Sequence, residues 1–444
     1  CLSRGLGDVY KRQVPADRGV PRRDGERIPE TGNRGTMTNT QKELLQALRC
    51  FMQGDEEYHL PERFSQLKEL CDLAAMHKIL AIIYEMIRRD AVLLLEENAP
   101  LAAKWKKSAI AEVMLQVQRT AGFLELYQKL QKEGVHPLVV KGLICRSFYE
   151  KPDFRISADE DLLLRKEEFE TFDRILLEEG YKRQELDPKD LPYEIPYRNP
   201  INQVYIELHF SLFAEGEGAY GHLNQEFAGA FDRCICEQIE GVDIKTLSPT
   251  DHMFYLICHS FKHFLHSGFG IRQVCDMVMM AKHYTTRIDW REIQDKLAQL
   301  RMDTFFSALA KIGREYLGCS WEKTGYVDDT QERVDCMPLL VDLLEGGVYG
   351  GSTMERRHSA NMTLEAARRG KKATASSVWS SLFPGVFYMK GHYVWLCKYP
   401  WLLPAAWVMR LFGYAADRKH TEDQSSLEIG KKRVELLRKY HVID

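Results

Sequence analysis

A change of periodicity near Gly134 constrains this chain more than any other feature of its sequence. Before Gly134, apolar residues recur at steps of three and four, which is the period of an amphipathic helix. After it, short apolar runs bounded by polar and turn residues follow one another, a pattern typical of strands. The helical period returns at Ser248, where Ser-Pro-Thr-Asp is typical of a helix start. We therefore expect an α+β fold, with a small α/β core embedded between helical segments.

A chain of 444 residues is too long for one compact core, so several regions are expected. They are a leader at 1–36, a helical region at 37–134, the α/β core at 135–247, a second helical region at 248–345 and a basic, aromatic helical region at 352–444. The leader is rich in Arg, Gly and Pro without apolar periodicity, so we expect it to be non-native or disordered. A first helix is expected after Met37, beginning near Gln41, where Thr38, Asn39 or Thr40 can cap it.

The apolar residues also predict individual elements. Strands are expected at 137–140, 161–164 and 204–210, with two further short strands on either side of Gly241. A long helix is expected at 102–132. Its apolar stripe comprises Ile110, Met114, Val117, Ala121, Leu124 and Leu130.

Acidic residues lie just ahead of, or within, two of the expected strands. Residues two apart on a strand point to the same face, so Asp159 and Asp161 project together while Glu160 points away. Adjacent carboxylates repel one another, and a bound Mg²⁺ relieves that repulsion. Glu207 on the next strand supplies the third acid needed to hold two ions for in-line attack on a phosphate. We expect these three carboxylates to converge.

Lys141 and Gly142 stand between the first strand and a short helix. Backbone N–H groups at a helix start can hold a triphosphate. Lys141 and Arg155 can neutralise the charge that develops in a transition state.

The run VVKGLICRSFYEKPDFRISADEDLLLR resembles the uncharacterised bacterial nucleotidyltransferases, a branch of the polymerase-beta-like superfamily. The later IELHF is similar to the acid-x-His strand of that family, with Glu207 and His209 in the two positions. The resemblance covers roughly residues 60–320. The residues that match the first motif are Lys141, Gly142, Tyr149, Arg155, Asp159 and Asp161.

The resemblance implies a palm-like nucleotidyltransferase core that moves an NMP from an NTP, such as ATP, to a hydroxyl acceptor with Mg²⁺, two ions being expected. It implies metal ligation by Asp159, Asp161 and Glu207, and nucleotide binding by Lys141, Gly142, Arg155 and His209. Two departures stand out. The usual Gly-Ser after the first strand is Lys-Gly-Leu here, and the third acid is Glu instead of Asp. The acceptor, whether a small molecule, a protein side chain or an RNA end, stays open.

Two other functions stay open beside this one. A degenerate nucleotidyltransferase fold acting as a binding module is compatible with the missing Gly-Ser. A metal-dependent glycosyltransferase can also use Asp-x-Asp, but it needs a larger nucleotide-binding sheet ahead of the acids than one strand.

Histidines crowd the stretch that follows Ser248. His259 and His263 are four apart and share a helix face, which resembles half of a zinc site. A metalloprotease has Glu directly after its first histidine, and Ser260 stands at that position here. We therefore expect the histidines to line a cleft or make core contacts, in preference to binding an acceptor or a metal. Arg272 and Asp276, also four apart, predict an ion pair. His252 and His266 complete the cluster.

The net charge of −3, from 61 basic and 64 acidic residues, gives no general affinity for nucleic acid. A local basic segment at 356–372 indicates a solvated helix face or, as the alternative, docking of an RNA, polyphosphate or acidic partner. The eleven cysteines include no CxxC pair, which favours reduced thiols in a cytoplasmic protein. No apolar run is long enough to predict a membrane-spanning helix.

Overall fold

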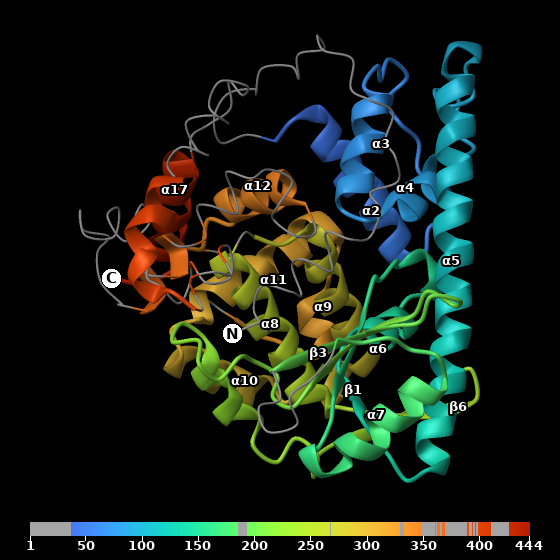
Figure 1. Cartoon of the computed structure of the whole chain (residues 1–444). Helices are drawn as coiled ribbons and strands as arrows, with labels where there is room; N and C mark the ends of the chain where they lie inside the picture. Colours follow the sequence, from blue (N-terminus) through green and yellow to red (C-terminus); the bar gives the residue numbers. More distant parts are fainter. Residues whose placement is uncertain are drawn as a thin grey trace.

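The computed structural model describes residues 37–184, 193–266, 268–328, 333–347 and 426–444, with positions 360, 362–364, 366–368, 389, 393, 396 and 398–409. The expectations for the leader 1–36 and for most of the basic segment 356–372 lie outside these residues. Within them, helices precede and follow a small mixed sheet (Figure 1), which confirms the expected α+β class.

Ahead of the sheet, the described part of the chain forms α2 (Asn39–Gln53), α3 (Leu67–Met76), α4 (Leu80–Ile87) and α5 (Ala99–Lys132). Thr38 caps α2 as expected. Its hydroxyl accepts a hydrogen bond from the Gln41 N–H at 3.2 Å, while the Gln41 side chain accepts one from the Thr38 N–H at 3.0 Å. The long helix α5 runs beside the sheet (Figure 1).

The buried face of α5 differs from the apolar stripe that its sequence indicates. Ile110, Met114 and Val117 are exposed, whereas Gln116 on the same helix is buried. The Gln116 side-chain oxygen accepts a hydrogen bond from the Ser157 N–H at 2.8 Å. Periodicity alone failed here because a buried loop, with backbone groups that need partners, packs against this turn of the helix.

The main sheet has the strand order β1-β2-β4-β3. Its strands are β1 (Leu138–Val139), β2 (Glu160–Leu163), β4 (Tyr205–His209) and β3 (Glu194–Arg198). β2 and β4 are parallel and the other two pairings are antiparallel. The register sets Asp161 opposite Glu207 and Leu163 opposite His209, so the polar ends of two central strands lie side by side.

Strand β3 was not expected from the sequence. Its residues include Pro196, which cannot donate a ladder hydrogen bond and so weakens the strand pattern. The structure accommodates it because β3 is the last strand of the sheet, where its one further backbone pairing is the bridge between Arg198 and Lys182 in the described part of the chain.

Helices and a hairpin complete the described part of the core. α6 (Gly142–Ser147) follows β1, and α7 (Phe169–Glu178) follows β2. The two short strands expected around Gly241 form a separate hairpin, β5 (Ile235–Ile239) and β6 (Val242–Thr246).

After the hairpin the chain is helical again, as expected. The described helices are α8 (Pro249–His266), α9 (Ile271–Tyr284), α10 (Trp290–Gln299), α11 (Asp303–Leu317), α12 (Met337–Gly346) and α17 (Ser426–Lys439). The last helix belongs to the same body. The Arg433 guanidinium on α17 is fully buried and donates to the His266 carbonyl at 2.8 Å. No helix among the described residues is long and apolar enough to cross a bilayer.

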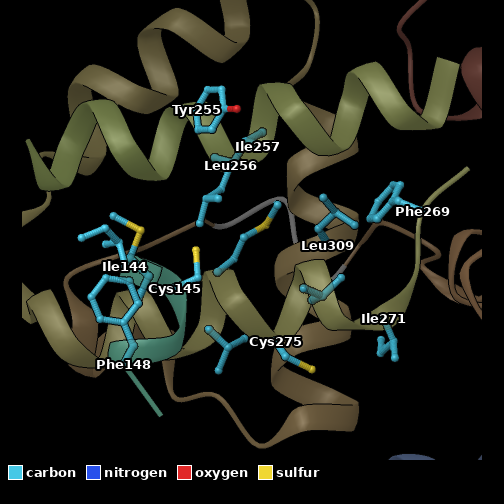
Figure 2. Packing of buried hydrophobic residues seen from close by; sticks show 14 of the residues in the cluster. Ile144, Cys145, Phe148, Tyr255, Leu256, Ile257, Phe269, Ile271, Cys275 and Leu309 are labelled. Atoms are coloured by element: carbon cyan, nitrogen blue, oxygen red, sulfur yellow. The ribbon is translucent and has the colours of Figure 1, made fainter. Parts of the chain in front are cut away.

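One hydrophobic core runs from the N-terminal helices through the sheet to α17. Figure 2 shows how it holds α6: Ile144, Cys145 and Phe148 lie in one buried cluster with Leu256 of α8 and Cys275 of α9. This packing holds the sheet, which carries the acidic residues, against α9 and against α8, which carries the four histidines of the cluster. The space between the sheet and these helices is where the polar residues meet.

Candidate active site

Three side chains from two neighbouring strands form a compact buried cluster. Asp161 lies on β2, and Glu207 and His209 lie on β4. One ligand atom from each lies within 4.8 Å of the other two. All three residues are at most 5% exposed. The cluster follows from strand geometry: Asp161 is in register with Glu207, and His209 shares a face with Glu207 because it is two residues further along.

Asp159 lies outside this compact group. Strand β2 begins at Glu160, so Asp159 precedes the strand instead of belonging to it. Its side chain is half-buried and lines the same cleft. The expected cluster of three carboxylates is therefore replaced by two carboxylates and an imidazole, with Asp159 nearby.

Glu160 points away from the cleft, as strand alternation indicates. Its carboxylate accepts a hydrogen bond from the Leu143 N–H at 2.6 Å and lies 2.7 Å from the Arg146 guanidinium. Gly142 has a φ of +42°, and a β-carbon there would collide with the Glu160 carboxylate. Gly142 thus permits this close approach. The expectation that the start of α6 holds a triphosphate is not supported, because its Leu143 N–H already donates to Glu160.

Lys141 reaches into the cleft beside the cluster. Its ammonium lies 2.8 Å from Asp161 Oδ2 and 3.3 Å from His259 Nε2. Burial alone would lower the pKa of Lys141, but the carboxylates of Asp161, Asp159 and Glu207 outweigh it and raise that pKa. The lysine is therefore charged.

The same arrangement fixes the charge of its two partners. Burial alone would raise the pKa of Asp161, but Lys141 and His209 hold it well below the usual value of an aspartate. Burial, with Lys141 beside it, lowers the pKa of His259 well below that of an exposed histidine. The cleft thus pairs an ionised carboxylate with an ammonium and places a neutral imidazole next to them.

Arg155, expected to bind triphosphate, is committed elsewhere. Its Nε lies 3.0 Å from Asp276 Oδ1 and its Nη2 lies 2.5 Å from Asp276 Oδ2, while the Tyr149 hydroxyl donates to Oδ1 at 2.9 Å. The expected pair of Arg272 with Asp276 is thus replaced by a bidentate pair with Arg155. Arg272 instead donates to the Ile156 carbonyl. Arg155 lines the cleft, but its hydrogen bonds tie the loop ahead of β2 to α9.

The histidine stretch divides between cleft and core. His259 and His263 line the cleft, with their Nε2 atoms 3.3 Å apart. His252 is buried, with Nδ1 3.4 Å from the Thr246 hydroxyl, and His266 meets the Tyr220 hydroxyl at 2.9 Å. The favoured expectation of cleft lining and core contacts agrees with these positions.

The cleft holds about 90 Å³ and has two unlike walls. The sheet side carries Asp161 and Glu207. The helical side carries Lys262 on α8 and Arg272 on α9, together with Asp276, whose carboxylate is paired with Arg155. Sequence reasoning did not single out Lys262 or the cleft residues Tyr193 and Tyr255. A signal for two of them existed, since Tyr255, His259 and Lys262 recur at helical spacing on one face.

Among the basic residues of segment 356–372, Arg368 is the one that the structure describes. Its Nε donates to Glu217 Oε1 at 3.0 Å, in the segment that follows β4. This residue is therefore engaged in an ion pair within the chain.

Comparison with known proteins supplies a family. The model of the family described as "Uncharacterised nucleotidyltransferase" matches residues 65–318, a stretch that includes the whole cleft. Among solved structures, an antigenic nucleotidyltransferase-like protein from Paracoccidioides brasiliensis is similar at 17% identity and a TM-score of 0.28, over 44% of this chain and 92% of that one. A search of the curated proteins found no match.

Proposed function

Because the chain belongs to the family of uncharacterised nucleotidyltransferases, we propose that it transfers a nucleoside monophosphate from an NTP to a hydroxyl acceptor in this cleft. The observation that carries the proposal is the buried cluster of Asp161, Glu207 and His209 with the Lys141 ammonium beside it. Buried carboxylates that face a solvent-lined cleft are costly unless they meet positive charge.

The cluster fits a divalent cation. Two carboxylates and an imidazole offer ligand atoms within 4.8 Å of one another, as a single ion requires. When bound, such an ion stabilises the charge that develops on the α-phosphate. Asp159 lines the cleft outside the cluster, so it remains to support a second ion or to accept a proton. The sequence predicted Mg²⁺, which prefers oxygen ligands, whereas the cluster includes the imidazole nitrogen of His209.

In this proposal, basic residues on the helical side of the cleft bind the phosphates of the NTP. The start of α6 is occupied by Glu160, and Arg155 is bound to Asp276. Lys262 and Arg272, which line the helical side of the cleft, are the cations that we assign to the β- and γ-phosphates, with Lys141 at the α-phosphate. This assignment moves nucleotide binding from the helix start to the wall formed by α8 and α9.

The chemistry is an in-line displacement. The acceptor oxygen forms a bond to the α-phosphorus as the bond from that phosphorus to pyrophosphate breaks. The hydroxyl proton passes to a carboxylate of the cleft outside the cluster, and we assign this role to Asp159, which lies two residues ahead of Asp161, because Asp276 is bound to Arg155. Lys141 offsets negative charge on the transferred phosphate from its position beside Asp161.

A transfer assay tests this function. The full chain is incubated with each α-labelled NTP, Mg²⁺ or Mn²⁺, and a cell extract as the source of acceptors. We expect label on an acceptor and a loss on the order of 10³-fold for Asp161→Asn, since the variant removes one charge from the cluster. The matched control is Asp243→Asn, at an exposed position of β6. Equal rates for the two variants would contradict the proposal, and absence of transfer by the wild type would favour the binding module.

A further inference from the structure

His209 distinguishes this cluster from a site made of oxygen ligands alone. The imidazole is 5% exposed and lines the cleft. Its Nε2 lies 3.5 Å from Asp161 Oδ1, and neither ring nitrogen makes a hydrogen bond with any residue of the described part of the chain. A buried polar group is normally hydrogen-bonded, so an imidazole without such a bond beside two carboxylates indicates a ligand that completes it.

The fold holds this imidazole in place. His209 is the last residue of β4, in register with Leu163 of β2, and its ring packs 5.2 Å from the ring of Tyr193, measured between centroids. A ligand positioned by strand pairing and ring packing costs little conformational entropy when an ion binds.

The donor set decides which ions suit the site. Mg²⁺ prefers oxygen ligands and gives up its water reluctantly, whereas imidazole suits first-row transition metals. The two carboxylates suit Mg²⁺ and Mn²⁺ alike, so the imidazole is the ligand that separates these two ions, in favour of the transition metal Mn²⁺. The Lys141 ammonium, 2.8 Å from Asp161 Oδ2, already places one positive charge at the cluster and so opposes a second ion there.

We propose that Asp161, Glu207 and His209 form a single-ion site for Mn²⁺, and that His209 sets the preference for Mn²⁺ over Mg²⁺. The inference rests on the proposed function for its biological meaning, but it concerns binding and can be tested without nucleotide transfer.

The test measures Mn²⁺ binding to the full chain without nucleotide. Electron paramagnetic resonance follows the loss of free Mn²⁺, and pulsed spectra detect ¹⁴N coupling from a coordinated imidazole. We expect one tight Mn²⁺ ion with ¹⁴N coupling, displaced poorly by Mg²⁺. In His209→Asp the coupling should vanish, and Mg²⁺ should displace Mn²⁺ more readily than it does from the wild type, because the nitrogen ligand that favours Mn²⁺ is replaced by oxygen.

His263→Gln is the control, because His263 lines the same cleft outside the cluster. It should keep both the coupling and the affinity. Wild-type protein that binds Mn²⁺ without ¹⁴N coupling would overturn the proposal, and this outcome does not depend on the folding of any variant. Coupling that survives in His209→Asp would overturn it as well. Nucleotide transfer without ¹⁴N coupling would refute this inference alone, whereas coupling without transfer would support it and refute the proposed function.

Discussion

The two faces of strand β2 carry adjacent buried carboxylates with different surroundings. On one face, Glu160 meets the Arg146 guanidinium and the Leu143 N–H, and nothing further is needed to satisfy it. On the other, Asp161 lies in a cleft with Lys141, Glu207 and His209. Both acids are at most 5% exposed, so burial does not separate them.

The two faces differ in the space around each carboxylate. Around Glu160 the chain closes to the point that Gly142 has no room for a β-carbon. Around Asp161 the chain leaves a cleft of about 90 Å³ lined by further charged groups. We infer that Glu160 contributes to stability, holding α6 against the sheet, and that Asp161 contributes to chemistry. The following experiments test that division.

The largest effect on stability is expected for Glu160→Gln. The variant keeps the size of the side chain but leaves the Arg146 guanidinium, 1% exposed, without its ionic partner. Removing one partner of a buried pair costs about 3–5 kcal/mol in the free energy of unfolding. Urea denaturation measures it. Asp161→Asn should lose less stability, because Lys141 keeps Glu207 and Asp159 nearby when Asp161 is neutralised. A smaller loss of stability in Glu160→Gln than in Asp161→Asn would contradict the division between the two faces.

A second buried pair tests whether Arg155 acts through structure. We expect a double-mutant cycle of Arg155→Gln and Asp276→Asn to give a coupling energy of about 1–3 kcal/mol in unfolding, because the pair is bidentate and buried. The exposed pair of Arg174 and Glu178 is the control and should give about 0.3–0.5 kcal/mol. Equal couplings would show that Arg155 is available for a ligand after all.

The close approach at Gly142 gives a smaller effect. Gly142→Ala places a methyl group against the Glu160 carboxylate at a φ of +42° and should cost about 1–3 kcal/mol of unfolding free energy. Gly134→Ala is matched in backbone strain, with a φ of +79°, but has open space around it. Thermal melts of the two variants separate crowding from strain. Identical melting temperatures would mean that Glu160 does not press on the start of α6.

The sequence predicted the cleft face of the sheet and missed the contacts behind it. Two-residue alternation placed Glu207 and His209 on one face, and the apolar run after Asp161 identified β2. Alternation gives no partner for Glu160, since Arg146 reaches it only once α6 is docked. The pair of Arg155 with Asp276 joins residues 121 positions apart, so the nearer Arg272 was the natural expectation.

Two other differences have the same origin. Pro196 concealed an edge strand that pairing with β4 stabilises. Gln116 on α5 is buried because it serves the backbone of the loop at Ser157, a need that apolar periodicity does not register. The local sequence pattern predicted most strands and helices and the face on which the acids lie. Polar contacts between residues far apart in the sequence could be identified only in the folded structure.

The most direct test of the account measures the two neighbouring variants, Asp161→Asn and Glu160→Gln, in the same two assays. Transfer of label from an α-labelled NTP gives the rate, and urea denaturation gives the free energy of unfolding, with the rate measured where each variant is fully folded. We predict opposite orders for the two variants. Asp161→Asn should lose on the order of 10³-fold in rate with the smaller loss of stability, and Glu160→Gln should lose more stability but less than about tenfold in rate. Similar rates for the two folded variants would contradict the claim that chemistry belongs to the cleft face of β2.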